Sequence, residues 1–170
     1  MISTRTEFLV GTTVSQGSTF DIEVDISGAV DLYAYQLDLA FNPTVLQATG
    51  TINEGSFFQS GGGFVPGIVD NTSGTITFNA DTLLGPISGL TGGGQLIVFE
   101  FAALASGSSS LDLANITLLD SNFNNIDFTS TDGSVTVTGS GPVPTPEPRS
   151  FLFLSIGICS LLAVFLFKRS

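Results

Sequence analysis

Residues 31–46 read Asp31-Leu-Tyr-Ala-Tyr-Gln-Leu-Asp-Leu-Ala-Phe-Asn-Pro-Thr-Val-Leu46. From Tyr33 to Phe41 every second residue is aromatic or aliphatic, while the residues between them are alanine, glutamine and aspartate. This two-residue period is typical of a β-strand with one face buried and one face in water. It predicts that Gln36 and Asp38 point to solvent, whereas the tyrosines belong to the core.

A strand of the same kind comes before it, because residues 20–26 alternate aliphatic or aromatic with acidic side chains. Further strands are predicted at 74–79, 95–102, 110–119, 125–129 and 134–138. Turns rich in Gly, Ser, Asp and Thr are expected at 60–63, 92–94, 106–110 and 131–134. One helical turn is expected at 44–48, after Pro43. Many short strands with regular turns predict an all-β sandwich.

The composition excludes several classes of function. The 170 residues include 15 Asp and Glu against 4 Lys and Arg, which gives a net charge of −11 and no basic surface for nucleic acid. Histidine is absent, so no Ser–His, Cys–His or histidine–metal site is available. The single cysteine excludes an internal disulfide. No catalytic residue and no cofactor is predicted.

Two acidic patterns have some features of a cation site. The acidic positions of residues 20–26 share one wet face, which is interpreted as a solvated surface. The run Asp120-Ser-Asn-Phe-Asn124 imitates the opening of a calcium loop, but Asn125 stands where such a loop needs glycine and Thr131 where it needs glutamate. A turn is therefore predicted, and no metal site. The aromatic residues Phe57, Phe58 and Phe64 are predicted to cap the core, with an exposed adhesive patch as the alternative.

The end of the chain differs from the rest. Residues 139–150 form a Gly/Pro-rich linker, and residues 151–167 carry no charge. Seventeen apolar residues are at the short end of what a membrane-spanning helix needs. The basic tail 168–170 predicts a cytoplasmic C-terminus, with the domain at 7–138 on the outer side of the membrane.

This tail resembles the PEP-CTERM sorting signal of exported Gram-negative proteins. The resemblance rests on Pro146-Glu147-Pro148, the apolar run, and the flanking Arg149, Lys168 and Arg169. It implies transient insertion in the inner membrane, processing by an exosortase-type machinery, and release to the cell surface or an exopolysaccharide matrix. Because residues 1–20 contain no apolar segment of a secretory signal, a signal peptide is expected upstream of Met1.

Residues 8–138 resemble the cohesin-like domain. The ordered motifs are Asp31–Leu46, Gly55-Ser-Phe-Phe58, Gly74–Ala80 and Leu90–Phe101. Asn42 stands where the family often has aspartate, and either side chain caps the turn. The resemblance implies a jelly-roll β-sandwich of about nine strands, related in fold to carbohydrate-binding modules, that is not an enzyme.

Cohesins of cellulosome scaffolds bind calcium-loaded dockerins through one exposed sheet. The resemblance places the strand with Gln36 and Asp38 in that sheet as a possible partner face. The expected function is an exported, non-catalytic binding or adhesion module whose ligand is a surface protein or an extracellular polysaccharide. The alternative is a structural matrix protein without a specific ligand.

Overall fold

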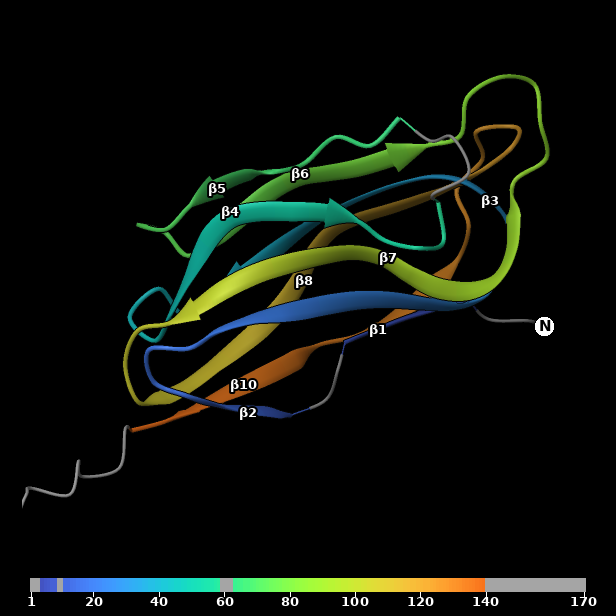
Figure 1. Ribbon diagram of the computed structural model, residues 1–170. Helices are drawn as coiled ribbons and strands as arrows, with labels where there is room; N and C mark the ends of the chain where they lie inside the picture. Colours follow the sequence, from blue (N-terminus) through green and yellow to red (C-terminus); the bar gives the residue numbers. More distant parts are fainter. Residues whose placement is uncertain (1–3, 9–10, 59–62, 140–170) are drawn as a thin grey trace, which may run out of the picture. The chain divides into compact units, whose positions relative to one another are not determined.

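The computed structural model describes residues 4–8, 11–58 and 63–139, and these contain strands and turns but no helix (Figure 1). The ten strands are β1 Thr4–Phe8, β2 Thr12–Ser15, β3 Thr19–Phe41, β4 Leu46–Glu54, β5 Ile68–Asp70, β6 Thr75–Thr82, β7 Leu90–Ala103, β8 Gly107–Asp120, β9 Phe128–Thr131 and β10 Gly133–Thr138. The all-β prediction is confirmed.

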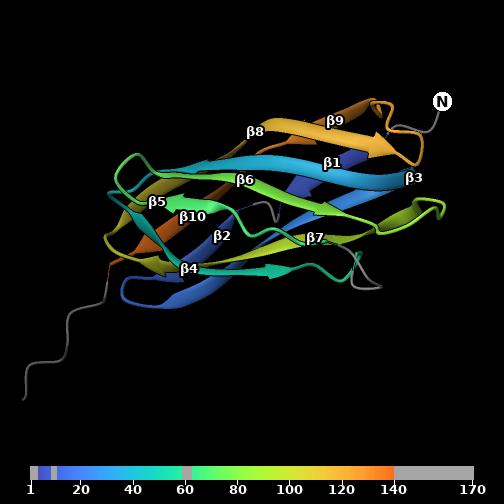
Figure 2. The same ribbon diagram turned by 90° about the horizontal axis from the view of Figure 1, so that it is seen from above.

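The long strand β3 belongs to both layers of a sandwich, and it turns back on itself halfway along (Figures 1 and 2). Its first half pairs with β1 and β7, and its second half pairs with β6 and β8. One layer therefore has the order β4-β7-β3-β1-β9, and the other has the order β5-β6-β3-β8-β10-β2. When β3 counts as two strands, and β1/β2 and β9/β10 each count as one interrupted strand, this is the expected nine-stranded jelly roll.

The reversal in β3 is fixed by a side chain. Gly28 and Asp31 both have positive φ, at 65° and 59°. One carboxylate oxygen of Asp31 accepts a hydrogen bond from the backbone N–H of Gly89 at 2.7 Å, and the other accepts from the Ser121 hydroxyl at 2.7 Å. These bonds, that of Ser121 first, hold the pKa of Asp31 below its ordinary value. They join the reversal to the β6–β7 and β8–β9 connections.

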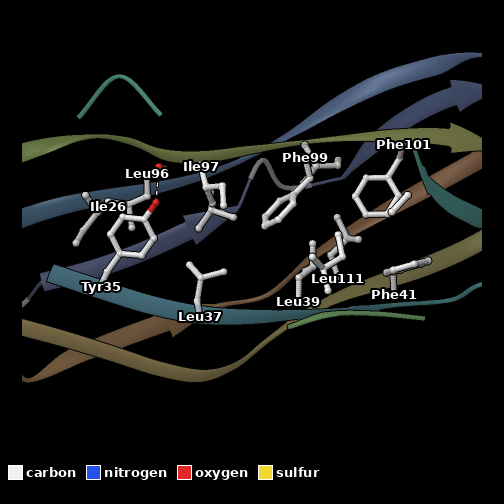
Figure 3. Packing of buried hydrophobic residues seen from close by; sticks show 14 of the residues in the cluster. Ile26, Tyr35, Leu37, Leu39, Phe41, Leu96, Ile97, Phe99, Phe101 and Leu111 are labelled. Carbon is white, nitrogen blue, oxygen red and sulfur yellow. Dashed lines mark hydrogen bonds between the residues drawn. The ribbon is translucent and has the colours of Figure 1, made fainter. Parts of the chain in front are cut away.

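The core fills the space between the layers. The alternating residues of β3 supply both halves of it, and β7 lines the layer opposite the second half of β3 (Figure 3). Phe41 meets Phe101 edge-to-face with 5.1 Å between ring centroids. Tyr33 and Tyr35 are 8% and 3% exposed, which confirms that they belong to the core. Phe58 is fully buried, and Phe57 and Phe64 pack against the core, so the capping interpretation of these aromatic residues is confirmed.

Several predicted turns and strand ends differ from the structure. Residues 92–94 lie inside β7, which passes so close to β3 that a Cβ on Gly93 would lie 2.7 Å from the carbonyl oxygen of Ile26. The turn predicted at 106–110 is mostly strand, because β8 begins at Gly107. The strand predicted at 125–129 is displaced to β9.

The segment after β3 is one helical turn that is not continued, because the backbone N–H of Leu46 donates to the Asn42 carbonyl at 3.0 Å. It spans residues 42–46 rather than the predicted 44–48, since β4 begins at Leu46. The Asn42 side-chain oxygen accepts hydrogen bonds from the backbone N–H of Thr44 at 3.0 Å and from its hydroxyl at 2.7 Å. Asparagine therefore caps this turn as expected. The strand β4 was not predicted because its sequence, Leu-Gln-Ala-Thr-Gly-Thr-Ile-Asn-Glu, has few apolar residues and a central glycine.

The chain divides into a compact unit at 1–140 and a second unit at 141–170. The predicted membrane helix at 151–167, most of the linker at 139–150 and the basic tail at 168–170 lie outside the described residues. Among the residues that are described, no helix has the length and apolar character needed to cross a membrane.

Candidate functional site

The outward surface of three neighbouring strands forms the candidate site. In the second half of β3, Gln36 and Asp38 point away from the core and are half-buried, as predicted. The pairing register places β6 on one side of them and β8 on the other. We call this surface the outer face; it consists of Ala34, Gln36, Asp38, Phe78, Ala80, Thr82, Asn115, Thr117 and Leu119.

Asp38 holds the outer face together. One of its carboxylate oxygens accepts a hydrogen bond from the backbone N–H of Phe78 on β6 at 2.7 Å. The other accepts from the Asn115 side-chain amide on β8 at 2.6 Å. The register of β3 shifts at this level against both neighbours, and Phe78 and Asn115 have positive φ, at 60° and 48°. A single carboxylate therefore bridges two bulges.

The bulge in β6 decides the orientation of Phe78. Ile76 is buried and Phe78 is 54% exposed, although strict alternation would put both on one face. A phenylalanine with positive φ is sterically unfavourable and costs of the order of 1 kcal/mol. Phe78 keeps this unfavourable φ although its ring lies in solvent, so core packing explains neither feature. Phe78 is therefore a candidate site residue that the sequence analysis did not single out.

Next to Phe78 the outer face is hollowed by about 270 Å³. Most of the lining residues are small or apolar, among them Ala34, Val65, Ala80 and Leu119. This volume lies just below the range of about 300–1,000 Å³ that is typical of pockets for small ligands.

The tyrosine rings and the acidic patterns do not contribute side chains to this face. Tyr33 and Tyr35 donate their hydroxyls to the carbonyls of Gly85 and Leu96, at 2.6 and 2.8 Å, and their rings are buried. They provide no platform for a sugar ring. The described residues contain no group of three or more acidic or cysteine side chains placed to hold a metal ion.

The loop that imitates a calcium site is a turn. The Asp120 carboxylate accepts hydrogen bonds from the backbone N–H groups of Asn122 and Asn124, both at 2.8 Å. The bond from Asn124 is the main cause that lowers the pKa of Asp120. Because this carboxylate already binds its own loop, the prediction of a turn is confirmed. The sorting-motif residues Pro146, Glu147, Pro148, Arg149, Lys168 and Arg169 lie outside the described residues.

The described strands form a two-layered jelly roll whose outer face is exposed and hollowed. The sequence of residues 8–137 matches the profile of the cohesin domain. The chain belongs to the cohesin family. Cohesin domains are non-catalytic binding modules, which agrees with the expectation that this protein is not an enzyme.

Solved structures have the same fold. A non-cellulosomal cohesin from the archaeon Archaeoglobus fulgidus is 21% identical with a TM-score of 0.67, and the match covers 80% of this chain and 91% of that one. A type II cohesin from Acetivibrio cellulolyticus is 17% identical, with a TM-score of 0.68 and coverage of 78% and 95%. A type I cohesin–dockerin complex from Clostridium thermocellum gives 10% identity, a TM-score of 0.68 and coverage of 82% and 96%.

The match covers more than nine tenths of each of these solved chains. Among curated proteins, no match to this sequence was found.

Proposed function

We propose that this chain is a protein-binding module that docks a dockerin-like domain on its outer face. The family supports a binding role, and similar structures from Clostridium thermocellum and Acetivibrio cellulolyticus are cohesin–dockerin complexes. The observation that carries the proposal is the Asp38 bridge, which holds the strained Phe78 ring in solvent beside an apolar hollow.

The chemistry of the outer face favours apolar contact. Asp38 is the only acidic or basic residue among the nine named for this face, and both of its oxygens are already engaged. Asp81, which also lines the hollow, is buried. Apolar residues at the centre of an interface supply most of its binding free energy when they fill a complementary pocket. The partner is therefore expected to insert one aliphatic side chain into the hollow and to pack against the Phe78 ring.

The test uses a protein of residues 1–140 and a panel of calcium-loaded dockerin domains of both types, with affinity measured by calorimetry. Saturable binding to one of them is expected. Replacing Phe78→Gly should weaken it at least tenfold, because the ring is lost while the backbone strain is relieved. Phe123→Gly is the matched control, since Phe123 also has positive φ, at 61°, and is 67% exposed, but lies in the β8–β9 turn. An equal loss of affinity in the two variants, or no binding to any dockerin of the panel, would contradict the proposal.

An extracellular polysaccharide is the second candidate partner. The observation that favours it is Phe123, an exposed ring flanked by exposed Asn122 and Asn124. Aromatic faces beside amide groups pack on and hydrogen-bond to sugars. A glycan array with the same protein separates the two partners, because sugar binding would depend on Phe123 and not on Phe78. A structural matrix protein would bind neither.

We further propose that the C-terminal residues sort this module to the cell surface or matrix. The support is the order of the Pro146-Glu147-Pro148 motif, an uncharged run and the basic Lys168-Arg169 pair. In this proposal the run enters the inner membrane, and an exosortase-type enzyme cuts near the motif. The domain would then act outside the cell.

A further inference from the structure

Two carboxyl groups, those of the buried Asp81 and the half-buried Glu54, each have one buried oxygen that lacks a partner. Asp81 on β6 is 2% exposed. Its Oδ1 accepts a hydrogen bond from the backbone N–H of Thr82 at 2.7 Å. Within the part of the chain that the structure describes, neither Oδ2 of Asp81 nor Oε1 of Glu54 has a hydrogen-bond partner, and both atoms are buried.

These two side chains belong to opposite layers. Asp81 pairs with Tyr35 in the layer of the outer face, whereas Glu54 ends β4 and pairs with Ile97 in the other layer. Burial raises the pKa of Asp81, and the Glu54 carboxyl raises it further through charge repulsion and a side-chain hydrogen bond, so the two carboxyl groups are neighbours. They therefore meet across the sandwich, near the edge formed by β4.

Among the described residues, no cationic side chain is recorded as acting on the pair. The titratable groups that face it are Asp81 on β6, Glu54 on β4 and Tyr35 on β3. The Tyr35 hydroxyl donates to the Leu96 carbonyl at 2.8 Å, as Figure 3 shows, so it has no second proton to offer. The residues that β7 contributes beside them, Leu96 and Ile97, are aliphatic. Two adjacent carboxylates in such surroundings cannot both stay ionised without a large free-energy cost.

We propose that the Asp81 carboxyl keeps its proton in the folded protein and donates it from Oδ2 to Oε1 of Glu54, and that this carboxyl pair is an acid-dependent clasp between the two layers. This proton turns two acceptors that lack partners into one hydrogen bond. When the proton leaves, the hydrogen bond is replaced by repulsion between like charges in a buried place.

The clasp controls the segment that follows β4. The backbone N–H of Gly55 donates to the Leu96 carbonyl at 2.9 Å, and that of Phe57 donates to the Gln95 carbonyl at 2.9 Å. The next residue, Phe58, is fully buried and meets the Tyr35 ring edge-to-face at 5.2 Å between centroids. Loss of the proton should loosen these contacts first, since they are continuous with Glu54.

The direction of the pH dependence follows from burial. Burial first, and the neighbouring Glu54 carboxyl, raise the pKa of Asp81 to about 7. Since the folded pKa is above the ordinary value of 3.8, the stabilisation is complete below pH ~4 and is lost as the pH rises through about 7. The folded domain is thus expected to be more stable in mildly acidic solution than in alkaline solution.

The experiment compares the melting temperature of residues 1–140 at pH 5 and pH 8.5. The wild-type Tm should fall by about 5 °C or more over this interval. Asp81→Asn and Glu54→Gln should show less than half of this fall and should melt above the wild type at pH 8.5, because an amide donates the missing hydrogen bond at every pH. Asp21→Asn, an exposed acid of β3, is the control and should behave as the wild type.

A second readout needs no variant. Corrected for intrinsic rates, hydrogen exchange of the Gly55 and Phe57 amides should be at least tenfold faster at pH 8.5 than at pH 5. A wild-type Tm equal at both pH values, or an undiminished fall in both variants, overturns the proposal. So does a rise of several degrees in the wild-type Tm with 5 mM CaCl₂ at pH 8.5 that Asp81→Asn removes, since a cation rather than a proton would then occupy the pair.

Discussion

Replacing Asp38→Ala removes the carboxylate that bridges β6 and β8. The side chain accepts two hydrogen bonds, from the Phe78 N–H at 2.7 Å and the Asn115 amide at 2.6 Å. A hydrogen bond to a charged group contributes about 1.5–3 kcal/mol when buried, and less when water competes. Because Asp38 is half-buried, we expect each bond to contribute about 1 kcal/mol, so the variant should lose about 2 kcal/mol of unfolding free energy.

Urea denaturation of residues 1–140 measures this loss. With a typical dependence of about 2 kcal/mol per molar urea, the midpoint should fall by about 1 M. Asp38→Asn is the matched control, since its amide oxygen still accepts from the Phe78 N–H; it should lose less than half as much. An Asp38→Ala midpoint within about 0.2 M of the wild type would refute the view that this carboxylate holds the two bulges.

Three further changes have defined outcomes. Phe99→Ala empties a fully buried site between the layers and should cost about 3–5 kcal/mol by urea denaturation; near-normal stability would contradict the core assignment. Hydrogen bonds, that of Ser121 first, lower the pKa of Asp31. The stabilisation by this carboxylate is therefore present above pH ~4 and lost in stronger acid, so Asp31→Asn should lose less unfolding free energy than the wild type between pH 5 and pH 3. In the native host, alanine at Glu147 and Pro148 should keep the full-length protein in the membrane fraction, whereas deletion of 149–170 should release the domain unprocessed; an extracellular protein whose mass still includes the basic tail would exclude the sorting proposal.

Local periodicity determined much of this protein. The alternation in β3 places Tyr35, Leu37 and Leu39 in the core and Gln36 and Asp38 outside, because consecutive side chains of a strand must point to opposite faces. Composition excluded histidine chemistry and disulfides without any structure. The order of the strand motifs was sufficient to recognise the cohesin family, which the match over 8–137 confirms.

Features that depend on neighbouring strands were decided by the tertiary structure alone. Phe78 reads as an inward residue two positions after Ile76, and only the register shift against β3 turns it outward. Residues 92–94 read as a turn, yet they pair in β7 because glycine permits the close approach of β3. In both places the deciding contact comes from a strand that is distant in the sequence.

The carboxyl pair of Glu54 and Asp81 likewise could not be predicted from the sequence. In the sequence Glu54 and Asp81 are two acidic residues among 15, with no motif around them. They become a pair because β4 and β6 belong to opposite layers whose separation is set by the aromatic core. A two-residue period specifies which face a side chain occupies, but only the packing of the layers decides what that face meets.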